Sequence, residues 1–136
     1  MGALMDKLVV PMPDIRILAA AEARIIIALR LAIIAHKTDQ DCRERLDEQL
    51  GGRQATTRLL IIAETVGFAW PEAFKLGCPC SPQTTPDEIL FLNMIRHVAS
   101  GNRAGYDALI CEMIDDSARD RIYADMEYFV AAYTGR

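Results

Sequence analysis

The chain has 136 residues and a net charge of −4 at neutral pH, with 51% hydrophobic and 25% charged residues. This length fits one domain with its own core, and the composition is that of a globular rather than a disordered chain. An acidic chain without a basic cluster argues against nucleic-acid binding, because neutralising phosphates supplies most of that affinity.

Residues 1–13 read as a lead-in closed by Pro11 and Pro13. The lead-in lacks the basic start and the long apolar stretch of a secretory signal. We therefore expect a cytoplasmic protein, in which four cysteines are thiols or ligands rather than a disulfide framework.

The first predicted helix runs from Asp14 to about Lys37, and its segment 25–35 is apolar except for Arg30. A helix that is apolar on nearly every side is a core element, an oligomer interface or a membrane span. Charged residues interrupt the whole helix too often for a span, namely Arg16, Glu22, Arg24, Arg30 and Lys37. We expect a central helix covered by its neighbours, or partly by a second subunit.

A second helix is predicted from Thr38 to the glycine pair 51–52, and a third from about Arg53 to Val66. Residues 67–84 are then too long for an ordinary helix connection. This central loop has room for a short helix over residues 71–75. Its apolar side chains are expected to plug the loop against the core; they are Trp70, Phe74 and Leu76.

The fourth helix carries the clearest start signal in the chain. Thr85 is the expected N-cap, Pro86 takes the first helical position, and Glu88 can complete a capping box. Two further helices are predicted, around residues 106–114 and after the cap 115–117. The pattern predicts an all-α, single-domain bundle or orthogonal array of five to six helices with one long central loop, over residues 1–136.

The segment Cys78-Pro79-Cys80 is the sharpest local feature. Two thiolates this close can bind one soft metal ion, but zinc needs two further ligands, or one and a water. The favoured protein ligand is His97, because the loop leads into its helix, and His36 is second. Two alternatives stay open: the cysteines are small apolar residues packed in a structural loop, or they form a reversible thiol switch.

Three segments carry a resemblance to a known family. They are the stretch 28–36 ending in His36, the stretch 58–64, and the Cys-Pro-Cys-Ser-Pro loop followed by Thr-x-Asp-Glu at 85–88. Over residues 14–98 the chain resembles an uncharacterised family of small all-helical bacterial proteins with a cysteine-containing loop. That family has no known activity, so the resemblance implies a helical domain and no particular function.

Conventional catalytic motifs such as Gly-x-Ser-x-Gly, His-Glu-x-x-His and the P-loop are missing. The sequence favours a non-enzymatic, cytoplasmic binding or regulatory module without a cofactor, self-associating as a homodimer, with a structural cysteine loop. The alternative is a small thiol- or zinc-dependent enzyme, or a redox or metal sensor, using Cys78 and Cys80. The module needs an exposed apolar patch, whereas the enzyme needs a loop-lined pocket with a histidine within reach of sulfur.

Overall fold

The computed structural model describes residues 13–134. The helical elements, in chain order, are η1 (Ile15–Ile17), α2 (Ala20–Thr38), α3 (Arg43–Leu50), α4 (Arg53–Ala69), α5 (Pro86–Ala99), α6 (Arg103–Ile110) and α7 (Asp116–Thr134). Within the described range there is no strand, and extended pairing is limited to one isolated bridge between Asp14 and Gln83. The predicted all-α, single-domain fold of five to six helices is confirmed. The predicted lead-in lies, except for Pro13, outside the described residues.

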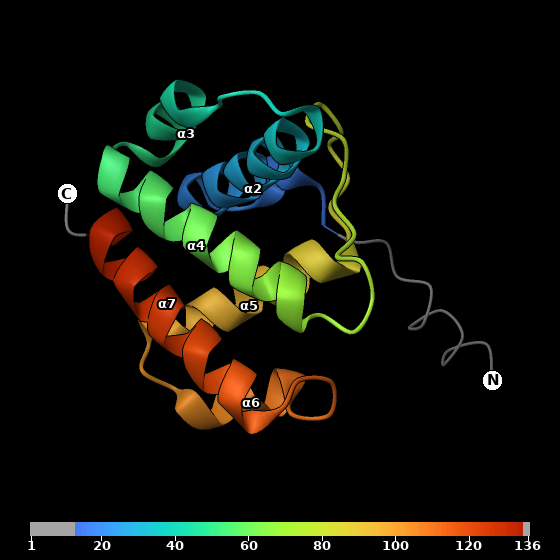
Figure 1. Cartoon of the computed structure of the whole chain (residues 1–136), viewed down its shortest axis with the longest axis vertical. Helices are drawn as coiled ribbons and strands as arrows, with labels where there is room; N and C mark the ends of the chain where they lie inside the picture. Colours follow the sequence, from blue (N-terminus) through green and yellow to red (C-terminus); the bar gives the residue numbers. More distant parts are fainter. Residues whose placement is uncertain (1–12, 135–136) are drawn as a thin grey trace.

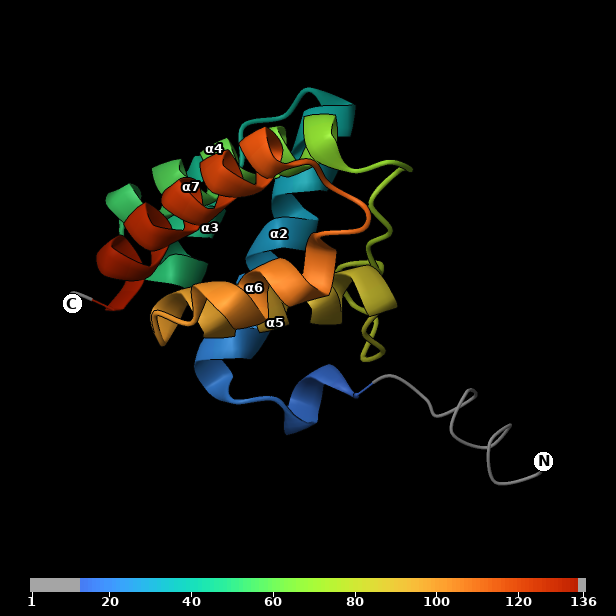
Figure 2. The same cartoon turned by 90° about the horizontal axis from the view of Figure 1, so that it is seen from below.

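The longest helices pack in two layers. Helices α4 and α7 lie side by side and run in opposite directions (Figure 1). Seen from below, α5 and α6 form the layer beneath them, and α2 crosses from one layer to the other (Figure 2). The core lies where these helices meet, and each of four helices contributes a side chain with no exposed surface, namely Ile26, Leu59, Phe91 and Phe129.

Helix α2 is covered mainly by its own chain. Its apolar residues on several sides are buried, including Ile25, Ile26 and Leu31. A fully buried Leu or Ile contributes about 1.5–3 kcal/mol to folding. Among the large apolar residues of α2, Ile34 is the most exposed, at 39%. No helix in the described part of the chain is both long enough and apolar enough to cross a bilayer.

The chain enters α2 differently from the prediction. Asp14 does not cap a long α-helix, because its carboxylate accepts a hydrogen bond from the Arg16 N–H and closes the short 3-10 helix η1. Leu18 and Ala19 then adopt extended backbone angles, so the α-helix begins only at Ala20. A local turn held by one side chain therefore replaces the first helical turns.

The predicted start of the second helix at Thr38 is wrong. Thr38 is the last residue of α2, where its hydroxyl donates to the Ile34 carbonyl, and Asp39 follows in the left-handed conformation. The α3 helix begins five residues later than predicted, at Arg43, and ends before Gly51 as expected. Asp39 tolerates the left-handed region better than most residues, which makes it a workable helix stop.

Helix α4 continues to Ala69, three residues beyond the predicted Val66. The short helix expected over residues 71–75 does not form, and this segment is irregular. The predicted start of the fourth helix is confirmed in full. The Thr85 hydroxyl accepts from the Glu88 N–H, and the Glu88 carboxylate accepts from the Thr85 N–H.

Candidate functional site

A buried ion pair holds the central loop, residues 70–85, against α2 and α5. Arg30 of α2 and Glu88 of α5 have no exposed side-chain surface. Their contact is bidentate: Nε of Arg30 donates to Oε2 of Glu88 at 2.7 Å, and Nη2 donates to Oε1 at 2.9 Å. Two parallel charge-assisted hydrogen bonds fix the relative orientation of the two groups as well as their distance.

The remaining donors of Arg30 bind the loop backbone. Nη1 donates to the carbonyls of Cys78 and Ser81 at 3.0 and 2.8 Å, and Nη2 donates to the carbonyl of Gln83 at 2.8 Å. A guanidinium has five N–H donors, and all five are used here. The loop is therefore wrapped around one side chain, which takes the place of the regular backbone pairing that the segment lacks.

Glu88 is equally well satisfied. Besides the two bonds from Arg30, its oxygens accept from the backbone N–H groups of Gly77 at 3.1 Å and Thr85 at 2.9 Å. Burial alone raises the pKa of Glu88, but these hydrogen bonds outweigh it, and the pKa of this carboxyl lies below its usual value. A carboxylate that is ionised, sealed from solvent and fully hydrogen-bonded has no free lone pair for acid–base catalysis.

Space around the guanidinium is tight at Gly77. A Cβ placed on Gly77 would lie 2.5 Å from Nη2 of Arg30 and 2.8 Å from its Cζ. The residue at this position must be glycine for the loop to approach the ion pair this closely.

The same wrapping turns both loop cysteines outward. The Ser81 N–H donates to the Cys78 carbonyl at 3.0 Å, which closes a turn with Pro79 and Cys80 in the middle. The backbone carbonyl of Cys78 faces Arg30, whereas the thiols of Cys78 and Cys80 are free and exposed. The loop is thus fixed through its carbonyls, and its cysteines do not pack into the core.

The two histidines predicted as metal ligands are not part of a cluster of ligating side chains within the described residues. His97 is eleven positions beyond Pro86 in α5, roughly 16 Å along a helix axis, and its ring lies 3.3 Å from the Asn102 amide nitrogen. His36 is exposed near the end of α2. Within residues 13–134, no three His, Cys, Asp or Glu side chains are grouped closely enough to hold a metal ion.

The first half of the loop, after α4, packs against the core through its apolar side chains, as predicted. Trp70 is buried, while Phe74 and Leu76 are half-buried and pack against the core. Trp70 and Phe74 have ring centroids 5.1 Å apart, and Phe74 meets Phe91 edge-on. Asp87 fixes the nearby backbone by accepting from the Lys75 N–H at 2.8 Å.

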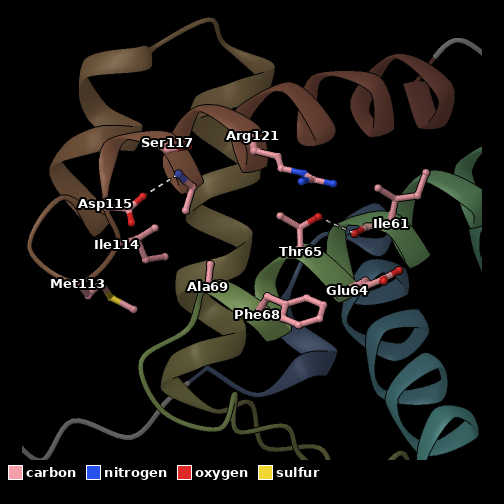
Figure 3. A pocket seen from close by; sticks show the side chains of 11 residues that line it. Ile61, Glu64, Thr65, Phe68, Ala69, Met113, Ile114, Asp115, Ser117 and Arg121 are labelled. Atoms are coloured by element: carbon pink, nitrogen blue, oxygen red, sulfur yellow. Dashed lines mark hydrogen bonds between the residues drawn. The ribbon is translucent and has the colours of Figure 1, made fainter.

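The second feature is an open groove of about 760 Å³ between the end of α4 and the start of α7. Its α4 wall includes Ile61, Glu64, Thr65 and Phe68. The facing wall includes Asp115, which immediately precedes α7, and Ser117 and Arg121 of α7. Figure 3 shows Glu64 and Phe68 extending from α4, with Arg121 extending from α7 across from them. Phe68 is 86% exposed, which is the largest exposure among the bulky apolar side chains of residues 13–134.

Two charged side chains at this groove, Glu64 and Arg121, have no partner among the described residues. Glu64 and Arg121 are both exposed, and neither side chain has a hydrogen bond or an ion pair within the described residues. By contrast, Asp115 caps α7 by accepting from the Ala118 N–H at 2.8 Å. The groove therefore offers one aromatic ring, one free carboxylate and one free guanidinium.

Sequence reasoning missed the roles of Arg30 and Phe68. A single arginine within an otherwise apolar segment is the available signal for a buried cation, because such a charge needs a partner. Phe68 gave no comparable signal, since the predicted helix ended at Val66 and left Phe68 in the loop.

Fold and site together define a small all-α protein with an internally anchored loop and an open groove of mixed polarity. No family model, no curated protein and no solved structure matches the chain. The resemblance to a bacterial family with a cysteine-containing loop therefore stays a prediction.

Proposed function

We propose that this chain is a non-enzymatic binding module that self-associates through the groove between α4 and α7, with a cysteine loop that serves a structural role. The observation that carries the proposal is Phe68, an aromatic ring that is 86% exposed at the edge of a groove of about 760 Å³. Aromatic side chains are enriched in the cores of protein interfaces, where they act as anchors that fill pockets of the partner.

The structural role of the loop is supported by the satisfaction of its polar groups from within. Arg30 and Glu88 use their hydrogen-bonding capacity on each other and on the loop backbone. Neither group has exposed surface with which to reach a substrate. The ion pair therefore explains the irregular loop without any catalytic role.

The self-association we expect depends on Phe68 rather than on α2. The helix that first suggested a dimer is covered largely by its own chain, and Ile34 is the most exposed of its large apolar residues. A two-fold dimer is the commonest way for a small protein to bury surplus apolar surface.

Sedimentation equilibrium at micromolar concentration tests this proposal. We expect the mass of a dimer for the parent chain and the mass of a monomer for Phe68→Ser. The matched control is Tyr128→Ser. Tyr128 is an aromatic residue of α7 that is 59% exposed and lies outside the groove. A parent chain that stays monomeric throughout the concentration range would reject self-association. Equal loss of the dimer in both variants would instead reject Phe68 as the specific contact.

A second candidate function is a thiol- or zinc-dependent sensor or enzyme that uses Cys78 and Cys80. The observation that favours it is the exposure of both thiols on a turn with a fixed backbone. The two cysteines supply only half of the ligands of a closed zinc site. Metal analysis of protein purified without added zinc tests it: stoichiometric zinc that is lost in Cys78→Ser supports the sensor, and absence of metal supports the structural loop.

A further inference from the structure

From the groove geometry we infer that the second copy binds reciprocally: each Phe68 enters the groove of the other chain, and Glu64 of each chain pairs with Arg121 of the other. This inference rests on the self-association proposed above. It adds the arrangement of the two chains and the residues that determine partner choice.

The spacing on α4 supports this arrangement. Glu64 and Phe68 are four residues apart, so they lie on the same side of the helix, one turn from each other. Figure 3 shows both beside the groove, with Arg121 on the facing helix. One helix thus presents an anchor and an anion, and the other presents a cation.

Charge complementarity fits a second copy as the occupant. In a two-fold contact the same surface patch is used on both chains, so a patch with one unpaired anion and one unpaired cation can satisfy both in duplicate. Glu64 and Arg121 have no partners within the described part of their own chain. A partner of one charge sign would leave either Glu64 or Arg121 unpaired.

The lining of the groove is a mixture of apolar and polar side chains, which is consistent with a contact that depends on charge pairing. Ile61, Ala69 and Ile114 form apolar parts of its lining, whereas Thr65, Asp115 and Ser117 are polar. A ring inserted among such side chains is oriented by the flanking charges rather than by a deep pocket. Like charges brought face to face at an interface are unfavourable, so the pairing disfavours orientations that place Glu64 against Glu64 or Arg121 against Arg121.

Charge reversal with rescue tests the reciprocal pairing. The variants are Glu64→Arg, Arg121→Glu and the double variant, and dimer dissociation constants are measured by sedimentation velocity. Each single reversal places two like-charged pairs in the dimer, so we expect at least about a tenfold weaker dimer. The double reversal restores opposite charges at both contacts, and we expect its dissociation constant to return to within about threefold of the parent value.

The outcomes separate this inference from the proposal on which it rests. Weakening by both single reversals with recovery in the double variant supports reciprocal pairing. If the parent chain dimerises through Phe68 but the single reversals have no effect, or the double variant is not rescued, reciprocal pairing is overturned and self-association stands. If the parent chain is monomeric, both fail. Far-ultraviolet dichroism of each variant checks that the helical fold is kept.

Discussion

The central loop and the α4–α7 groove differ in whether their charged side chains have partners within the protein. At the loop, the side chains of Arg30 and Glu88 are fully buried and every one of their hydrogen-bonding positions is satisfied internally. In the groove, one aromatic and two charged side chains lie at the surface, and Glu64 and Arg121 have no partner within the described residues.

This contrast separates polar groups that are used within the fold from polar groups that are free to bind. A buried ion pair gains little over well-packed apolar residues, but removing one partner leaves a costly unpaired charge. An exposed, unpaired charge contributes little to folding and is free to bind another molecule. Substitutions in the loop should therefore change the free energy of unfolding, whereas those in the groove should change association.

The largest effect is expected for Glu88→Ala. This substitution leaves the buried Arg30 guanidinium without its carboxylate and removes two acceptors for the loop and cap N–H groups. Breaking a buried pair in this way costs about 3–5 kcal/mol of unfolding free energy, measured by urea denaturation. The control is Glu22→Ala, which breaks the exposed pair with Arg96 and should cost about 1 kcal/mol or less. Similar losses in the two variants would contradict the structural role of Arg30 and Glu88.

Acid should reproduce a smaller part of that loss, because a protonated Glu88 still fills its site. The pKa of Glu88 is lower in the folded state than its usual value, so the carboxylate stabilises the fold above the unfolded-state pKa of about 4.3. That contribution is lost as the pH falls through the folded-state pKa. We expect the difference in stability between the parent chain and Glu88→Gln to be largest near neutral pH and to shrink below about pH 4.3. Parallel pH curves for the two proteins would show that Glu88 does not carry this dependence.

Alanine substitutions at two glycines, one beside the ion pair and one in α4, should change the free energy of unfolding by intermediate amounts and in opposite directions. Gly77→Ala places a methyl group against an Arg30 guanidinium that five hydrogen bonds hold in place, and overpacking of this kind costs about 1–3 kcal/mol. Gly67→Ala adds the same methyl group inside α4, where no heavy atom lies within 4 Å of it. Better helix propensity should then raise stability by about 0.5–1 kcal/mol. Urea midpoints that move in the same direction for both variants would refute the close approach at Gly77.

Thr85→Ala should cost about 1 kcal/mol through loss of the α5 N-cap. The Thr85 hydroxyl also donates to the Lys75 carbonyl at 2.7 Å, so the loop should loosen at the same time. Thermal unfolding measures the stability change, and amide hydrogen exchange should increase around the start of α5. A variant as stable as the parent chain would contradict the cap.

The smallest change in folding is expected for Phe68→Ser, within about 0.5 kcal/mol, since the ring is already 86% exposed. The free energy of unfolding should be measured by denaturation in dilute solution, where association does not contribute. A loss above about 1 kcal/mol would place Phe68 among the folding residues and remove the contrast between groove and loop.

Local signals were sufficient wherever a structure depends on neighbours in sequence. The capping box at Thr85 and Glu88 spans one helical turn, and the glycine after α3 acts on the preceding turn. Helical periodicity likewise identified the all-α class. Boundaries failed where two local signals competed: Asp14 closes a 3-10 turn, and Thr38 ends one helix instead of starting the next.

What the sequence determined by itself was the helical class, the central loop and the start of α5, because caps and helical periods act within a few residues. The tertiary structure decided the rest. Arg30 lies 58 positions from Glu88 and 48 from Cys78, so no short-range pattern could show that one guanidinium binds both. The exposure of Phe68 likewise depends on where α7 packs against α4, and that packing joins segments far apart in the chain.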